Sequence, residues 1–90
     1  MTVPSQPVQI TLLTQPACGL CGQAKQVLDR LGRDYPLTVT ELDLTTLDGQ
    51  ALAARAGVVF APGVLVDGEP FSFGRLSERK LRRKLDRRRP

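Results

Sequence analysis

The sequence predicts an α/β fold in which a four-stranded mixed sheet carries helices on both faces. Apolar runs of strand length alternate with segments whose apolar residues recur at helical spacing, in the order strand, helix, strand, helix, hairpin, helix. A strand, a crossover helix and a second strand form a parallel pair, whereas a hairpin adds antiparallel strands. With 90 residues the chain has room for one core, so we expect a single domain over residues 1–90.

The first strand and the first helix lie on either side of the two cysteines of the chain. Residues 8–14 form a short apolar run rich in β-branched residues, which is typical of a buried strand. From Gly22 onward the apolar residues share one helical face, and Gly32 is the expected C-terminal cap. Cys18 and Cys21 therefore stand at the start of this helix. Its apolar face comprises Leu20, Ala24, Val27, Leu28 and Leu31.

The second strand and the second helix are predicted from alternation and capping. Residues 37–44 alternate in polarity, which predicts a strand but leaves open which side is buried. Thr45 or Thr46 can cap the helix that follows, and Gly57 ends it. Gly49 lies inside the first turn, where its low helix propensity weakens the prediction.

A hairpin and a basic helix complete the chain. Asp67-Gly68 favours a tight type I′ turn between strands at residues 64–66 and 70–73. Ser77 is a suitable N-cap for a last helix over residues 77–88. The apolar residues expected to hold this helix on the core are Leu76, Leu81 and Leu85.

Composition excludes several classes of protein. Apolar residues make up 41% of the chain, which argues against disorder, and no apolar run approaches the roughly 20 residues that span a bilayer. Residues 1–9 contain neither a basic start nor an apolar signal core. We therefore expect a cytoplasmic monomer without a membrane partner.

Two cysteines three positions apart predict redox chemistry. They are too close in sequence for their disulfide to stabilise the fold as the disulfides of small secreted domains do. A zinc site needs four ligands, and the chain has no histidine and no third cysteine, so we expect no metal. A helix N-terminus should lower the pKa of the Cys18 thiol, while Cys21, one turn further, would resolve a mixed disulfide. The alternatives are two ordinary core cysteines or a metal site. Lys25 is expected to be a solvated side chain outside the catalytic set.

Two segments resemble the glutaredoxin-like branch of the thioredoxin superfamily. They are Pro-Ala-Cys-Gly-Leu-Cys at residues 16–21 and Phe-Ala-Pro at residues 60–62, the latter preceding Val-Leu-Val-Asp-Gly-Glu. The resemblance spans residues 8–86 and implies a thioredoxin-like three-layer fold of order β-α-β-α-β-β-α. It also implies a thiol-disulfide oxidoreductase that reduces disulfides in protein substrates, and a cis Pro62 facing the cysteines.

The same resemblance implies a substrate site, and the sequence departs from typical glutaredoxins at some of its positions. A partner chain would pair with the backbone near Ala61, and the residues expected to contact it are Ala17, Gly19, Leu20, Ala61 and Pro62. Typical glutaredoxins have Pro-Tyr between the cysteines, Lys three residues before them and Gly-Gly after the hairpin, where this chain has Gly19-Leu20, Gln15 and Phe73-Gly74. Because these departures remove parts of the glutathione site, we expect no bound cofactor, and the thiol reductant is either glutathione or a reductase.

The C-terminal segment suggests a different class of function. Residues 75–90 hold nine Lys or Arg against two acids, giving +7, so residues 1–74 carry −3 of the total +4. Such a cluster could make the chain a binding module for an acidic partner or nucleic acid. The absence of interleaved aromatic residues disfavours nucleic acid, and a solvated amphipathic helix is the favoured explanation of the charges. A third possibility is a redox-sensing domain, in which oxidation of the cysteines changes a binding surface without catalytic turnover.

Overall fold

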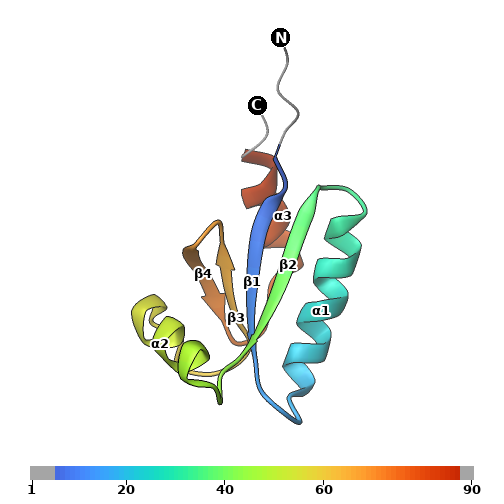
Figure 1. Cartoon of the computed structure of the whole chain (residues 1–90). Coiled ribbons are helices and arrows are strands. Elements are labelled where there is room, and N and C mark those ends of the chain that lie inside the picture. Colours follow the sequence, from blue (N-terminus) through green and yellow to red (C-terminus); the bar gives the residue numbers. More distant parts are fainter. Residues whose placement is uncertain (1–5, 88–90) are drawn as a thin grey trace.

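The computed structural model describes residues 6–87 and has the predicted order of elements (Figure 1). In the sheet, β1 is parallel to β2 and antiparallel to β3, β3 is antiparallel to β4, and the strand order is β2-β1-β3-β4. The predicted four-stranded mixed sheet is therefore confirmed. The strands are β1 (Val8–Thr14), β2 (Leu37–Asp43), β3 (Gly63–Val66) and β4 (Glu69–Phe73), and the helices are α1 (Gly19–Gly32), α2 (Leu47–Ala56) and α3 (Glu78–Arg87).

The sheet separates two cores of unequal size, which confirms the expected helices on both faces. The α1/α3 core takes its buried side chains from one face of β1 and β3 and from both helices; among them are Ile10, Leu12, Leu31, Val64 and Leu81. The α2 core on the opposite face has Leu13, Ala53 and Leu65 as its buried members. Most of the buried apolar surface therefore lies beneath α1 and α3. Within residues 6–87, every helix is too short or too polar to cross a membrane.

The structure answers the open question about the facing of β2. Leu37 lies opposite Val8 and packs toward the α1/α3 core, whereas Leu42 lies opposite Leu13 and packs toward α2. The residues between them are exposed, and Val39 keeps 43% of its surface. As an edge strand, β2 is covered only at its ends, so alternation alone could not identify a buried side.

The prediction that Gly32 caps α1 was wrong. The helix runs through Gly32, and its C-cap is Arg33 in a right-handed conformation with φ −77°. The backbone N–H groups of Asp34 and Tyr35 both donate to the Leu31 carbonyl. Tyr35 is buried in the α1/α3 core, so tertiary packing turns the chain without a left-handed glycine.

The other turn and capping predictions are confirmed. Gly57 ends α2 in the left-handed region with φ 72°, and Asp67 and Gly68 have the positive φ angles of a type I′ turn. The Ser77 hydroxyl accepts a hydrogen bond from the backbone N–H of Lys80 at 3.2 Å, which caps α3. Residue 88, the predicted end of this helix, lies outside the described residues.

Gly49 has a steric role that its position in the sequence does not reveal. Thr46 is the N-cap of α2, and Gly49 is buried in the first turn. A Cβ atom at Gly49 would lie 2.0 Å from the carbonyl oxygen of Asp43. The start of α2 therefore lies directly against the end of β2, a close approach that only glycine permits.

Candidate functional site

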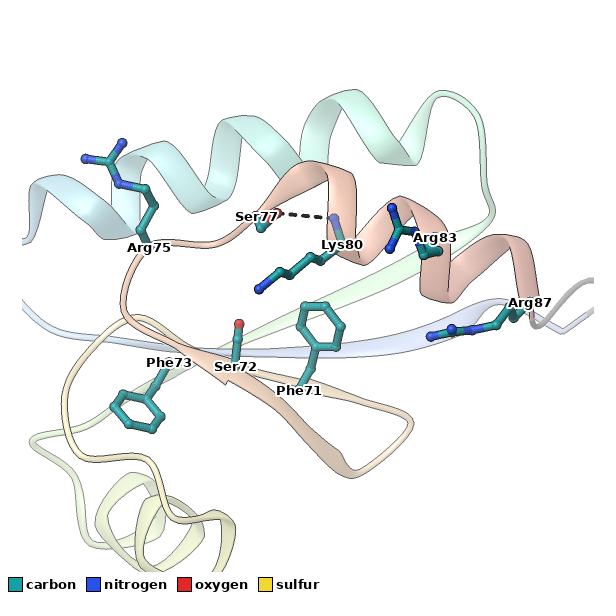
Figure 2. A pocket seen from close by; sticks show the side chains of 8 residues that line it. All are labelled: Phe71, Ser72, Phe73, Arg75, Ser77, Lys80, Arg83 and Arg87. Carbon is teal, nitrogen blue, oxygen red and sulfur yellow. Dashed lines mark hydrogen bonds between the residues drawn. The ribbon is translucent and has the colours of Figure 1, made fainter.

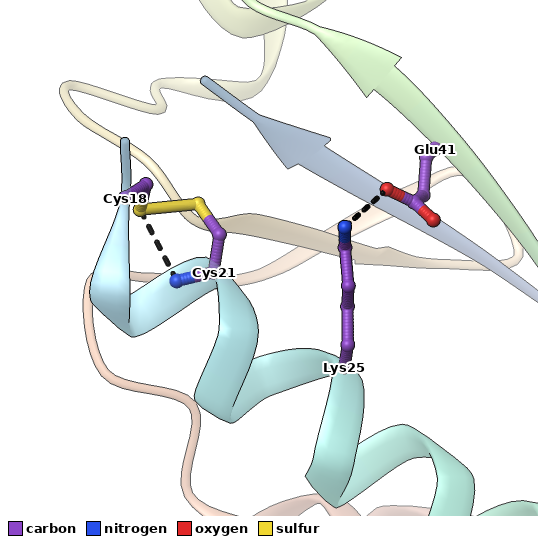
Figure 3. Close-up of a disulfide and its surroundings, with 4 residues drawn as sticks. All are labelled: Cys18, Cys21, Lys25 and Glu41. Atoms are coloured by element: carbon purple, nitrogen blue, oxygen red, sulfur yellow. Dashed lines mark hydrogen bonds and ion pairs between the residues drawn. A yellow bond between two sulfur atoms is a disulfide. The ribbon is translucent and has the colours of Figure 1, made fainter. Parts of the chain in front are cut away.

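The two cysteines form a disulfide at the start of α1, immediately after the turn that leaves β1 (Figure 3). Cys18 is the N-cap residue with an extended backbone, and its Sγ atom accepts a hydrogen bond from the backbone N–H of Cys21 at 3.1 Å. The Cα atoms of the pair are 5.2 Å apart. The predicted position of Cys18 at the helix N-terminus is therefore confirmed.

The two cysteines differ in their access to solvent. Cys18 is half-buried, whereas Cys21 retains only 4% of its surface and packs among the buried residues of α1. An incoming reactant can therefore reach Cys18 more readily than Cys21. This difference fits the nucleophile and the resolving thiol of a two-cysteine cycle.

The residues beside and between the cysteines form an open rim. Ala17 has φ 55°, a left-handed conformation that is strained for a residue with a Cβ atom, and it turns the chain sharply between β1 and α1. Ala17 and Gly19 are exposed, and Leu20 is half-buried. These three predicted contact residues are therefore accessible from solvent next to Cys18.

The loop that contains Pro62 lies at the same end of the sheet as the cysteine turn. Gly63 is opposite Leu13 near the end of β1, and the Ala61–Pro62 peptide bond is cis, as the family resemblance implied. The Pro62 carbonyl accepts a hydrogen bond from the backbone N–H of Gly74 at 2.8 Å. The side chains of Ala61 and Pro62 are buried.

Sequence reasoning missed two exposed apolar side chains just before this loop. Val59 keeps 77% of its surface and Phe60 keeps 51%. The Phe60 ring packs edge-to-face against Phe73, with 5.1 Å between ring centroids. The available signal was an adjacent apolar pair between Gly57 and Pro62, in a segment that showed neither strand nor helix periodicity. Exposed apolar side chains of this size mark a candidate contact surface.

An ion pair between α1 and β2 lies beyond the cysteines. Lys25, one turn beyond Cys21, forms an ion pair with Glu41 across to β2 at 3.0 Å, and both side chains are about half exposed (Figure 3). The expectation of a merely solvated Lys25 therefore missed this pairing, although an exposed pair of this kind contributes little to stability. Within residues 6–87, His, Cys, Asp and Glu side chains nowhere gather in threes that could bind a metal ion.

Electrostatic interactions instead tie α3 to α1. The Arg30 guanidinium donates two hydrogen bonds to Glu78 and thereby holds the pKa of that carboxyl below its usual value. Tyr35 donates a hydrogen bond to Asp86, and this contact raises the pKa of the tyrosine. These contacts fix the helix that follows the hairpin.

Comparison with solved structures identifies the fold. A point mutant of thioredoxin from Halobacterium salinarum NRC-1 is 25% identical with a TM-score of 0.69, and the match covers 89% of this chain and 73% of that chain. The thioredoxin-like protein BC3987 is 25% identical with a TM-score of 0.68, covering 82% of this chain and 96% of that chain. A malarial protein shares the fold at 16% identity and a TM-score of 0.69, over 91% of this chain and 97% of its own.

Comparison of sequences identifies the family. A search of the curated proteins found no match of significant similarity. The family model of the glutaredoxin-like domain, however, matches residues 9–86, which include both cysteines, Pro62 and almost all of the described elements. The chain therefore belongs to the glutaredoxin-like domain family and has a thioredoxin-like fold with a Cys18-Cys21 pair.

Proposed function

We propose that this protein is a thiol-disulfide oxidoreductase that reduces a disulfide bond in a protein partner. The observation that carries the proposal is the unequal exposure of the bonded pair: Cys18 is half-buried at a helix start, and Cys21 is buried behind it. A redox cycle needs one sulfur that meets the substrate and one that stays out of reach until the intermediate forms.

The cycle begins with both cysteines reduced. The Cys18 thiolate attacks one sulfur of the partner disulfide, so that a mixed disulfide forms and the other partner sulfur leaves as a thiolate. Cys21 then loses its proton and attacks the Cys18 sulfur, which releases the second partner thiolate and leaves the Cys18–Cys21 disulfide. Two electrons have passed to the partner, and an external thiol reductant returns the pair to its dithiol form.

The start of α1 supports the role of Cys18 as the nucleophile. The backbone N–H of Cys21 already points at the Cys18 sulfur, and the positive end of the helix dipole faces the same atom. Both interactions favour a negatively charged sulfur over a neutral thiol.

The loop before β3 supplies a surface for the partner. In our proposal the backbone at Ala61, beside cis Pro62, pairs with the chain that flanks the partner disulfide. Val59 and Phe60 are exposed next to it and would cover apolar side chains of that chain. The rim around Cys18, formed by Ala17, Gly19 and Leu20, would form the other side of this partner-binding surface.

Trapping the intermediate tests the proposal. Reduced Cys21→Ser protein, incubated with insulin as a generic protein disulfide, should accumulate a mixed disulfide through Cys18 that mass spectrometry detects. Cys18→Ser protein should form none, because buried Cys21 cannot reach the substrate, and Cys18→Ser/Cys21→Ser protein serves as the blank. Equal trapping by both single variants, or none by either, would refute the assigned roles.

The reduction potential tests the direction of electron flow. We propose a reductant that works in the cytoplasm with either glutathione or a reductase protein as its electron donor. Equilibration with defined thiol/disulfide buffers should then give a value between about −270 and −200 mV. A value near about −120 mV would instead indicate an oxidant. A pair that equilibrates but does not turn over insulin would favour a redox sensor.

A further inference from the structure

A basic groove lies between the edge strand β4 and helix α3, outside the cysteine site (Figure 2). Its volume is about 490 Å³. Phe71 and Ser72 contribute from β4, and Lys80, Arg83 and Arg87 contribute from α3, with Arg75 at one end. Among residues 6–87, the side chains that line it include no acidic one. A groove of this composition is complementary to a negatively charged ligand.

An irregularity in β4 shapes the floor of the groove. Val64 lies opposite Ser72 and Leu65 lies opposite Pro70, so Phe71 is an extra residue in β4. A bulge of this kind breaks strict alternation, and both Phe71 and Ser72 turn toward α3. Phe71 is half-buried against the α1/α3 core, and the Ser72 hydroxyl is buried without a hydrogen-bond partner among the described residues. The floor thus combines an apolar surface with an unsatisfied polar group.

The cations that line the groove differ from those on the opposite side of α3. Arg82 faces the loop that follows α1 and is paired with Asp34 in that loop at 2.9 Å and with Glu78 of α3 at 3.6 Å. By contrast, Lys80, Arg83 and Arg87 form no ion pair within residues 6–87. Figure 2 shows Lys80 reaching from α3 toward Ser72 and Phe71. These charges repel one another unless an anion is bound, whereas Arg82 already has acidic partners.

The spacing of the cations indicates an extended ligand. Lys80 and Arg87 are seven residues apart on one helix, which corresponds to about 10 Å along its axis. Carboxylates on alternate residues of an extended chain are about 7 Å apart, so such a chain can meet these cations in succession, whereas one small anion cannot. A nucleic acid fits less well, because no aromatic residue stands among the cations of residues 80–87 on which successive bases could stack.

We propose that this groove binds an extended acidic segment of a partner protein. The groove begins beside the substrate loop, since Gly74, which precedes Arg75, donates its backbone N–H to the Pro62 carbonyl. A partner whose disulfide lies at Cys18 could therefore place an acidic flanking segment along α3. The proposed binding of the acidic segment does not depend on the redox function, whereas its role in selecting substrates rests on the proposed redox function.

Peptide binding tests the proposal. The probe is the extended peptide acetyl-Thr-Glu-Val-Glu-Val-Glu-Thr-amide, titrated into the ¹⁵N-labelled full chain while backbone amide shifts are followed. We expect shifts concentrated in residues 69–87. Each of three exposed ion pairs should raise the affinity for the peptide by about 1.4- to 5-fold. The variant Lys80→Gln/Arg83→Gln/Arg87→Gln should therefore bind the peptide about tenfold more weakly.

A charge-matched variant separates the groove from general attraction. Arg33→Gln/Arg55→Gln/Arg79→Gln removes the same charge from exposed positions outside the groove and should weaken binding less than twofold. Equal weakening by both variants would overturn the proposal, as would equal binding of a peptide with Gln in place of Glu. Tighter binding of a ten-nucleotide oligothymidylate, with displacement of the peptide, would show a nucleic-acid site instead.

A second measurement separates this proposal from the redox function. Cys18→Ser protein should bind the acidic peptide unchanged. A peptide disulfide with an acidic flank should be reduced with a higher kcat/KM than its glutamine counterpart, and the groove variant should lose this preference while reducing the neutral peptide normally. Binding without any disulfide exchange would refute the redox function alone. Exchange without a preference for acidic flanks would refute the role in substrate selection.

Discussion

The start of α1 and the start of α2 contain the same hydrogen bond made by different atoms. At α2 the Thr46 hydroxyl accepts from the backbone N–H of Gly49 at 3.0 Å, and at α1 the Cys18 sulfur accepts from the backbone N–H of Cys21 at 3.1 Å. The threonine hydroxyl satisfies an orphan donor of the helix and donates its own hydrogen to the Asp43 carbonyl, so its role is structural. The cysteine makes the same contact with an atom that can also carry charge and exchange bonds.

The difference between these two helix starts shows how a structural contact can become a chemical one. A helix N-terminus holds unpaired donors and a positive dipole whatever residue caps it. A hydroxyl cap uses them for stability, whereas a sulfur cap uses them to favour the thiolate. If this is correct, the capping role and the redox role of Cys18 can be separated by substitution.

The largest effect should come from separating these two roles. Cys18→Ser and Cys18→Ala should both lower the rate of insulin reduction by about a thousandfold or more, because the nucleophile is gone. Serine keeps a capping oxygen and alanine does not, so Cys18→Ala should be less stable than Cys18→Ser by about 1 kcal/mol. Denaturant unfolding under reducing conditions measures this difference. Equal stability of the two variants would mean that Cys18 does not act as a cap.

The next largest effect should come from the glycines near the two helix starts. Gly49→Ala should lower the free energy of unfolding by about 3 kcal/mol or more, because its Cβ would overlap the Asp43 carbonyl and force α2 away from β2. Gly22 in α1 is the matched control, since a Cβ there meets open space. Gly22→Ala should stabilise the protein by up to about 1 kcal/mol through helix propensity. Similar values for the two variants would contradict the close approach at Gly49.

A smaller effect should come from the hydroxyl cap itself. Thr46→Ala should lower the free energy of unfolding by about 1 kcal/mol, because the N–H of Gly49 loses its acceptor at the start of α2. Thr46→Ser retains the oxygen and should stay within about 0.5 kcal/mol of the parent protein. Denaturant unfolding of both variants measures the difference. If Thr46→Ser were as unstable as Thr46→Ala, packing of the threonine methyl group would explain the loss rather than capping.

Features set by neighbouring residues could be predicted from the sequence. The caps at Thr46 and Ser77, the turn at Asp67-Gly68 and the placement of Cys18 at a helix start each depend on a few adjacent residues with strong conformational preferences. The cis bond before Pro62 was expected from family resemblance, since local chemistry permits either isomer.

Features set by tertiary packing could not be predicted. From the sequence, Gly49 only weakened the prediction of a helix. The need for glycine at this position comes from the Asp43 carbonyl and depends on how closely α2 approaches β2. Gly32 carried a capping signal that the burial of Tyr35 in the α1/α3 core overrode. The exposure of Phe60 depends on which elements pack against the loop before β3. Each of these outcomes requires the tertiary arrangement, which propensity does not encode.

The smallest effect should come from the ion pair that ties the start of α3 to α1. The Arg30 guanidinium lowers the pKa of Glu78, so the folded state favours its ionised form more than the unfolded chain does. The resulting stability is present above the unfolded pKa and is lost as pH falls through the lower folded pKa. Glu78→Gln lacks it at every pH, so its Tm should lie slightly below the parent Tm at pH 7. The two values should converge as pH falls below the lowered folded pKa, where the glutamate is protonated in both states, and Arg30→Gln should follow the same pattern. A Tm difference that persists at low pH would mean that Glu78 stabilises α3 through packing rather than through its charge.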